Sequence, residues 1–454
     1  LGASLLLVPI HATRSPDCGG VLTPAGLSYF AEISKPHAET VLRQDLMAPT
    51  APNLFRGATK PSSRNQINSV TVTELTLTLI PDTGLRLSID VDLGITPTPS
   101  ATKVMKLSIL SDLHVEMNPE GNLEMVASAC KTSLEEMQST EEMERSTPQF
   151  FLFWDLSNRG KEGTEAQICL EVTKLLLLPN ERLMSLTAQF PVTPSCQVQY
   201  LPLAAPMFSE QGITISLQTI FQVVGMAIPL PVSPVPFSMP EPASSSPSHL
   251  TLAFSEHFYS SLFFALEMAG AFNMTIPVSR ANEEQKIKIT LLPRQMGSLF
   301  QEDLPVMLQA VFRSSPRVVL EEGKAALKLF LTVHVGAETP AFQSFLSVNV
   351  DMTAGLLLSV VDTRMMISAP SKGMCPCHSR ERRGRDALLE ELFLPTIREE
   401  IPAQMNVVLS EGVFLPHISS FTYTDVNVMI HKDYVLIPCN LKLQVRPGEQ
   451  ITMS

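Results

Sequence analysis

The sequence has little positive charge for a protein of its length. It holds 33 Lys and Arg against 45 Asp and Glu among 454 residues, which gives a formal net charge of -12. Because long-range charge does not draw such a protein to nucleic acid or to an anionic membrane, we expect no nucleic-acid partner. Charged residues make up only 17% against 44% hydrophobic residues, which excludes a disordered chain and leaves enough apolar surface for two domains.

Long uncharged apolar runs are also missing. The segment 249–272, HLTLAFSEHFYSSLFFALEMAGAF, contains five Phe, yet its uncharged stretch from Phe258 to Leu266 is bounded by Glu256 and Glu267. A membrane-spanning helix needs about 20 apolar residues, so we expect a buried helix here and no transmembrane segment.

Motifs of catalytic sites are absent as well. The sequence contains no phosphate-binding Gly-rich loop, no zinc-protease helix and no nucleophile elbow. Cys375, Cys377 and His378 resemble part of a metal site, but no second ligand pair of a structural zinc site follows, and an oxidised or solvated loop is the alternative. We therefore expect no enzyme activity, no cofactor and no metal, although a catalytic triad assembled only in space would leave no motif.

The N-terminal segment and the cysteines point to an extracellular protein. LGASLLLVPIHATRSPDC resembles the end of a secretory signal peptide, so residues 1–12 are expected to be removed; a buried strand is the alternative. Seven Cys in an oxidising compartment predict disulfides with at least one thiol left over. Asn273, in Asn-Met-Thr, is a weak candidate for N-glycosylation.

Long strands with one apolar face recur along the chain. Residues 85–95, LRLSIDVDLGI, place apolar side chains on one face and polar ones on the other, and residues 70–79 read as the partner strand with a bulge near Glu74. Residues 106–117, 123–130 and 327–335 repeat the pattern. Strands of about 11 residues run roughly 35 Å, so these sheets must twist and curl around something.

Helices are fewer and stand at the start of each half. Thr23-Pro24 predicts a capped helix start, followed by Leu27, Phe30 and Ile33 on one face. Ser255 can cap a second helix, in which the apolar residues four apart are Phe254, Phe258, Leu262 and Leu266. A third helix is expected over residues 386–410, with kinks at Pro395 and Pro402.

A proline-rich segment, residues 228–248, separates two similar halves and suits an extended connector. Each half begins with an apolar helix and continues in long strands, so the fold class is α+β and a duplicated unit is indicated. A helix against a curled sheet leaves either a filled core or an elongated apolar cavity. The seven apolar residues named on the first two helices are therefore candidates for contact with the core or with lipid.

Five segments resemble, in order, landmarks of the family of bactericidal/permeability-increasing protein, LPS-binding protein and PLUNC. These are LTPAGLSYFAEISKPHAETVLRQDL, IPDTGLRLSIDVDLGI, VQYLPLAAPMFSEQGITISLQ, LTLAFSEHFYSSLFFALEMAGAFNMTI and GVFLPHISSFTYTDVNVMIHKDYVLI. The resemblance implies a boomerang of two elongated barrels, 18–200 and 249–454, joined through a central sheet and linker at 201–248. It further implies apolar pockets that take acyl chains, and a disulfide between Cys130 and Cys169.

Two segments depart from that family pattern. The two glycines of SNRGKEG, residues 157–163, make a continuous helix before Cys169 doubtful. GMCPCHSRERRGRD, residues 373–386, stands where relatives have a Leu-rich strand, which puts the second pocket in doubt. The run Arg380, Arg382, Arg383 and Arg385 in it contacts an anionic head group or, more commonly, lies in a solvated loop.

The sequence thus predicts a secreted, non-enzymatic protein that binds phospholipid or another lipid. Burial of a long acyl chain supplies far more free energy than one surface cation near a head group. Two alternatives stay open: a defence protein that binds lipopolysaccharide or bacterial surfaces, and a structural extracellular protein with filled barrels.

Overall fold

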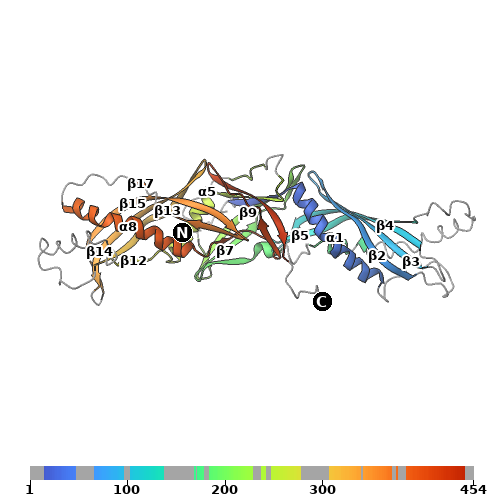
Figure 1. Ribbon diagram of the computed structural model, residues 1–454, viewed down its shortest axis with the longest axis horizontal. Helices are drawn as coiled ribbons and strands as arrows, with labels where there is room; N and C mark the ends of the chain where they lie inside the picture. The colour runs from blue at the N-terminus through green and yellow to red at the C-terminus, as the bar shows by residue number, and fades with distance from the viewer. Residues whose placement is uncertain are drawn as a thin grey trace, which may run out of the picture.

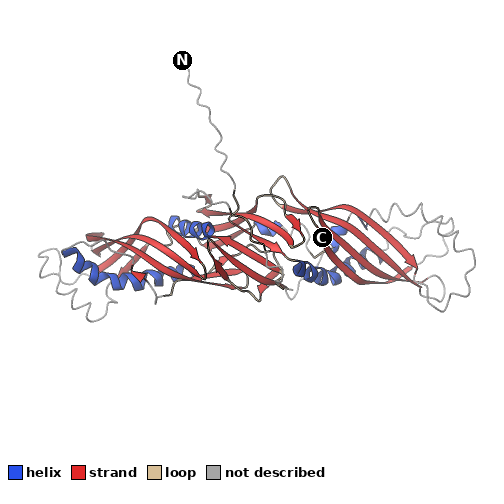
Figure 2. Cartoon of the chain, turned by 90° about the horizontal axis from the view of Figure 1, so that it is seen from above, coloured by secondary structure: helices blue, strands red, loops and turns tan. Residues whose placement is uncertain are grey.

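The computed structural model describes residues 15–47, 66–96, 103–136, 168–169, 171–177, 184–228, 237–241, 247–277, 306–338, 341–370, 375–376 and 385–444. The molecule is elongated, with one curled sheet at each end and a third sheet between them (Figure 1). Helices lie alongside the sheets in both halves (Figure 2). The expected α+β class with two curled antiparallel sheets and helices against them is confirmed.

The N-terminal half contains a four-stranded antiparallel sheet in the order β2-β3-β4-β5. Its strands are β2 (Gln66–Ile80), β3 (Gly84–Thr96), β4 (Lys103–Met117) and β5 (Leu123–Glu136). The inward positions of β3 are Leu85, Leu87, Ile89, Val91 and Leu93, each at most 3% exposed. A register shift between Val72 and Glu74 confirms the predicted bulge.

The first helix, α1 (Pro24–Met47), begins where the capping pattern predicts. The Thr23 Oγ1 accepts a hydrogen bond from the Gly26 amide at 3.2 Å and donates one to the Ser248 carbonyl at 2.5 Å. The cap therefore also joins the start of α1 to the segment that opens the second half. Two short 3-10 helices, η1 (Val172–Leu175) and η2 (Met184–Thr187), follow the four-stranded sheet along the chain.

The central sheet combines strands from both ends of the chain, in the order β19-β21-β11-β1-β9-β7-β6. Its members are β1 (Cys18–Leu22), β6 (Gln189–Thr193), β7 (Cys196–Pro202), β8 (Met207–Ser209), β9 (Gly212–Val223), β10 (Met226–Ala227), β11 (Leu250–Ser255), β19 (Phe421–Thr424), β20 (Met429–His431) and β21 (Tyr434–Leu443). β1 and β11, the first strands of the two halves, pair antiparallel with Cys18 opposite Phe254. Backbone hydrogen bonds thus join the halves directly.

Among the described residues, the C-terminal half contains a seven-stranded sheet and two helices. The elements are α5 (Glu256–Met268), β12 (Met274–Pro277), β13 (Val306–Glu321), β14 (Lys324–Glu338), β15 (Phe342–Val361), β16 (Arg364–Ser368), β17 (Cys375–Pro376), α8 (Arg385–Leu409) and β18 (Val413–Phe414). The third predicted helix is confirmed as α8, which contains both Pro395 and Pro402.

The second helix begins as predicted, but one residue grouped with its apolar face lies outside it. Phe254, assigned to the second helix, lies instead in β11, whose backbone pairs with β1 on one side and β21 on the other. These two sets of hydrogen bonds hold the chain extended up to Ser255. Ser255 is the N-cap of α5, as predicted, and its Oγ accepts from the Phe258 amide at 3.3 Å.

The two departures from the family pattern fall largely outside the described residues. Residues 157–163 lie wholly outside them, and so do residues 377–384. From the segment 373–386 the structure describes the strand β17, which pairs Thr353 with Cys375 and Met352 with Pro376 on β15, and the start of α8.

Candidate functional site

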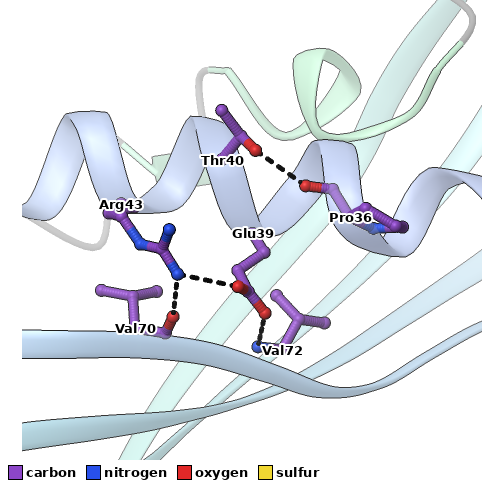
Figure 3. A network of polar contacts seen from close by, with 6 residues as sticks. All are labelled: Pro36, Glu39, Thr40, Arg43, Val70 and Val72. Carbon is purple, nitrogen blue, oxygen red and sulfur yellow. Dashed lines mark hydrogen bonds and ion pairs between the residues drawn. The ribbon is translucent and has the colours of Figure 1, made fainter.

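Polar contacts hold α1 along the free edge of β2 (Figure 3). The Glu39 carboxylate accepts a hydrogen bond from the Val72 amide at 3.1 Å, while Arg43 donates to the Val70 carbonyl at 3.2 Å and to Glu39 at 2.8 Å. The Lys35 ammonium donates to the Thr73 carbonyl at 2.7 Å. These side chains satisfy backbone groups that an edge strand leaves without a neighbouring strand, so they fix the position of the helix on the sheet.

A second set of contacts links α1 to β5 indirectly, through the segment around η1. The buried Ser34 Oγ accepts from the Leu177 amide at 3.1 Å. The predicted disulfide between Cys130 and Cys169 is present, with 5.5 Å between the Cα atoms, and joins the segment leading to η1 to β5. For a sequence separation of 39 between the two cysteines, the chain-entropy model gives a stabilisation of about 4 kcal/mol.

The inner face of this sheet is sealed over β3 but accessible at β5. On β4, the inward Leu107, Ile109 and Leu113 are at most 3% exposed. Directly opposite them, and therefore on the same face, β5 carries Leu134, Thr132 and Ala127, which are only half-buried. Ala127 and Leu134 pack against the buried aliphatic cluster. This end of the inner face is thus partly accessible and continuous with the core, and it is the candidate site for an apolar ligand.

The N-terminal candidates on α1 belong to or pack against the same apolar cluster. Leu27 is 3% and Phe30 5% exposed, and Ile33 is half-buried against the same cluster. The Phe30 ring lies 6.2 Å from that of Phe421 in β19. α1 therefore presents these three residues towards the interior, as predicted from their place on one face of the helix.

The C-terminal candidates lie within a packed aromatic core. Phe254, Phe258, Leu262 and Leu266 each have 0% exposure. The Phe258 ring lies 4.8 Å from Phe254, 5.1 Å from Tyr259 and 6.3 Å from Phe221, measured between centroids. These residues belong to one buried cluster, as their spacing predicts. In the structure they contact other side chains of the protein.

Electrostatics single out one buried carboxyl group at the centre of the molecule. Asp17 is 2% exposed, and its Oδ1 accepts from the Thr219 amide at 2.9 Å and the Thr219 hydroxyl at 3.0 Å. Burial raises the pKa of Asp17 to about 6, although the bonds from Thr219 act in the opposite direction. Burial, with the Asp17 charge, also raises the pKa of the neighbouring Cys18 thiol well above its ordinary value. Such a thiol stays protonated and unreactive.

The remaining predicted sites are only partly described. Asn273 and Thr275 are exposed at the start of β12, so a glycan there has room. The side chains of Cys375, Cys377, His378 and of the arginine run lie outside the described residues. Within the described ranges, no group of three or more His, Cys, Asp or Glu side chains could hold a metal ion, and no helix is long and apolar enough to cross a membrane.

Sequence reasoning missed the accessible inner face of β5. The register between β4 and β5 shifts between Asp112 and Leu113, so the inward residues of β5 change parity along the strand. A simple alternation over residues 123–136 therefore does not identify which side chains face inward. The small or polar inward residues Ala127 and Thr132 were the available signal, because they seal an interior less well than Leu or Val.

Two curled antiparallel sheets, each with helices against it and joined through a shared central sheet, define the class of BPI-like proteins. The model of the LBP / BPI / CETP family, C-terminal domain, matches residues 193–443, and the chain belongs to this family. It is 57% identical to Protein TENP of Gallus gallus over 449 residues, 98% of this chain and 99% of that protein. BPI fold-containing family B member 2 of Homo sapiens is 24% identical and covers 97% of each chain.

A solved structure has the same architecture. The crystal structure of lipopolysaccharide binding protein matches with a TM-score of 0.54 over 95% of this chain and 100% of that one. Its sequence identity is 15%, so this likeness concerns the fold.

Proposed function

We propose that the protein is a secreted, non-enzymatic lipid carrier that holds a phospholipid or another acyl-chain molecule against the inner face of its N-terminal sheet. The observation that carries this proposal is the half-buried apolar end of that face along β5, beside a sealed aliphatic core. Membership of the family, whose resemblance implies acyl-chain pockets, supports the same conclusion.

The proposed ligand-binding residues come from two walls of the N-terminal half. Leu27, Phe30 and Ile33 on α1 would contact one side of the acyl chain, and Ala127 and Leu134 on β5 the other. We assign four residues to the packing of the C-terminal half because none of their surface is exposed: Phe254, Phe258, Leu262 and Leu266.

The free energies expected from acyl-chain burial and from head-group contacts favour a lipid without net charge. A buried acyl chain of 16 carbons supplies roughly 12 kcal/mol before the costs of association. A surface cation near an anionic head group supplies about 1 kcal/mol, and salt lowers it. With a net charge of -12 the chain as a whole gives no general attraction for anionic head groups. The apolar interior would set the affinity.

Secretion and glycosylation are part of the proposal. The disulfide between Cys130 and Cys169 is typical of an oxidising compartment, and Asn273 is accessible for a glycan. Intact-mass analysis of protein secreted from a eukaryotic host, before and after enzymatic removal of N-glycans, tests the modification, and an Asn273→Gln variant should lose it.

The lipid proposal is tested by extracting the purified protein with organic solvent, identifying lipids by mass spectrometry, and titrating with a fluorescent acyl probe. We expect bound lipid, and about tenfold weaker probe binding for Leu134→Gln, because a polar amide would enter the acyl-chain site. Leu110→Gln is the matched control, since Leu110 lies on the adjacent strand with 42% exposure and faces outward. Absence of both extracted lipid and probe uptake would overturn the proposal.

The alternative of a defence protein acting on bacterial surfaces makes a different prediction. Its basis is the family and the arginine run at residues 380–385. Salt-sensitive binding to bacteria or lipopolysaccharide that weakens when these arginines are neutralised would favour it over lipid carriage. A structural protein with filled barrels would show neither activity.

A further inference from the structure

An exposed apolar projection stands at one end of the central sheet. The β9–β10 hairpin turns through Val224 and Gly225, and Val224 is 76% and Met226 71% exposed. The Val224 amide donates to the Ser195 carbonyl at 2.9 Å, and the Ser195 hydroxyl donates to the Ala269 carbonyl at 3.5 Å. The hairpin therefore adjoins the end of α5, where Met268 is 55% exposed. We call Val224, Met226 and Met268 the apolar tip.

The backbone at the apolar tip is strained, because Val224 has a positive φ that a β-branched residue rarely adopts. Val224 has a φ of 51° and Gly225 a φ of 77°, the left-handed pair of a two-residue hairpin turn in which Asn-Gly is favoured. A β-branched residue is an outlier in this region. The other described non-glycine residues with positive φ are all polar: Asp82, Asp362, Ser420, Asp425 and Asp433. A strained position that keeps an exposed apolar side chain indicates a use for that side chain.

The segments that form the apolar tip carry no charged side chain. Residues 189–202, 212–228 and 268–277, which supply the hairpin, the strands β6, β7 and β9 and the end of α5, contain no Asp, Glu, Lys or Arg. Glu267 is the adjacent carboxyl group; it is half-buried, it bonds to Ser315, and its burial raises its pKa. In a protein of net charge -12, long-range repulsion disfavours an anionic membrane or a second copy of the chain as the occupant of this uncharged apolar surface.

We propose that the apolar tip docks the protein on zwitterionic phospholipid surfaces by inserting Val224, Met226 and Met268 among the head groups. Such insertion gains from burial of apolar side chains and needs no anionic lipid. The proposal goes beyond lipid carriage and does not use the residues of the inner face, so either can fail alone.

The test is sedimentation with vesicles of pure phosphatidylcholine. We expect the wild type to sediment with the vesicles. The partition coefficient of a Val224→Asn, Met226→Gln double variant should be lower by about tenfold or more. Val224→Asn alone should raise the melting temperature, since Asn adopts a positive φ more readily than Val. A variant that is more stable but docks less well separates lost function from poor folding.

Matched controls come from two equally exposed residues elsewhere. Val407 on α8 is 73% and Met207 on β8 is 66% exposed, so Val407→Asn and Met207→Gln should leave sedimentation unchanged. Leu134→Gln, designed against acyl-probe uptake, should also sediment normally. Failure of the wild type to bind the vesicles, equal losses in the controls, or binding that requires anionic lipid and weakens with salt would each overturn the proposal. A concentration-dependent dimer abolished by Val224→Asn would assign the apolar tip to self-association instead.

Discussion

The two halves share one architecture but differ in how their interiors are filled. In the C-terminal half the inward residues of β14, Leu327, Leu329, Leu331, Val333 and Val335, are each at most 1% exposed. In the N-terminal half the central strand β3 is equally well buried, but three inward residues of the edge strand β5, Ala127, Thr132 and Leu134, are half-buried. A curled sheet against a helix therefore does not by itself decide between a packed core and an accessible interior.

The types of residue in the two cores account for this difference. The larger cluster contains Tyr200, Phe221, Phe254, Phe258, Tyr259, Phe263, Phe272, Phe393 and Tyr423, whereas the N-terminal cluster has Phe30, Phe208 and Phe421 among mostly aliphatic residues. Aromatic rings in mutual contact fill a wide interior, and small aliphatic or polar residues leave an edge of it accessible. The difference supports the proposed division, in which α5 packs the interior and α1 and β5 contact the ligand.

The largest expected effect tests the packed half. Phe258→Ala should destabilise the protein by about 4 kcal/mol, because it removes a fully buried ring in contact with several others. Acyl-probe uptake under native conditions should be retained. Urea denaturation gives the free energy of unfolding; a loss below about 1 kcal/mol, or loss of uptake in the folded variant, would contradict the assignment.

The next prediction concerns the N-terminal half alone. Replacing both Cys130 and Cys169 by Ser should cost roughly 3 to 4 kcal/mol, since the cross-link closes a long loop. Amide exchange should accelerate on β5 and around η1, while β13 and β14 stay protected. Uniform acceleration in both halves would show that the disulfide supports the whole molecule rather than this interior.

The sequence predicts a structural feature well when neighbouring residues determine it, and poorly when distant parts of the chain do. Strand β3 and the caps at Thr23 and Ser255 follow from local patterns, because alternation and side-chain capping are fixed by neighbouring residues. The place of Phe254 in a strand does not, since β1 and β21, which hold it extended, come from distant parts of the chain. The accessible face of β5 depends on a register shift that alternation cannot locate.

A third prediction concerns the junction of the halves. Because the pKa of Asp17 is raised from 3.8 to about 6, its contribution to stability is greatest below pH 4 and is lost as the pH rises through 6. Asp17→Asn keeps a carbonyl oxygen for the bonds from Thr219 and should therefore be more stable than wild type by up to about 3 kcal/mol at pH 7. At pH 4 the difference should largely vanish. Urea midpoints measured from pH 4 to 8 check this, and a difference independent of pH would contradict it.

The last prediction compares a Leu→Ala substitution in each half, and the smallest effect is expected in the N-terminal half. Leu331→Ala should cost about 3 kcal/mol, because Leu331 is 1% exposed and its removal leaves a cavity. Leu134→Ala should lower the free energy of unfolding by about 1 kcal/mol or less, since a half-buried side chain is already partly exposed to water. If the inner face of β5 binds lipid, saturating acyl ligand should stabilise wild type more than Leu134→Ala and should stabilise Leu331→Ala as much as wild type. Equal costs for the two substitutions, or equal ligand effects in all three proteins, would remove the distinction between a sealed and an accessible interior.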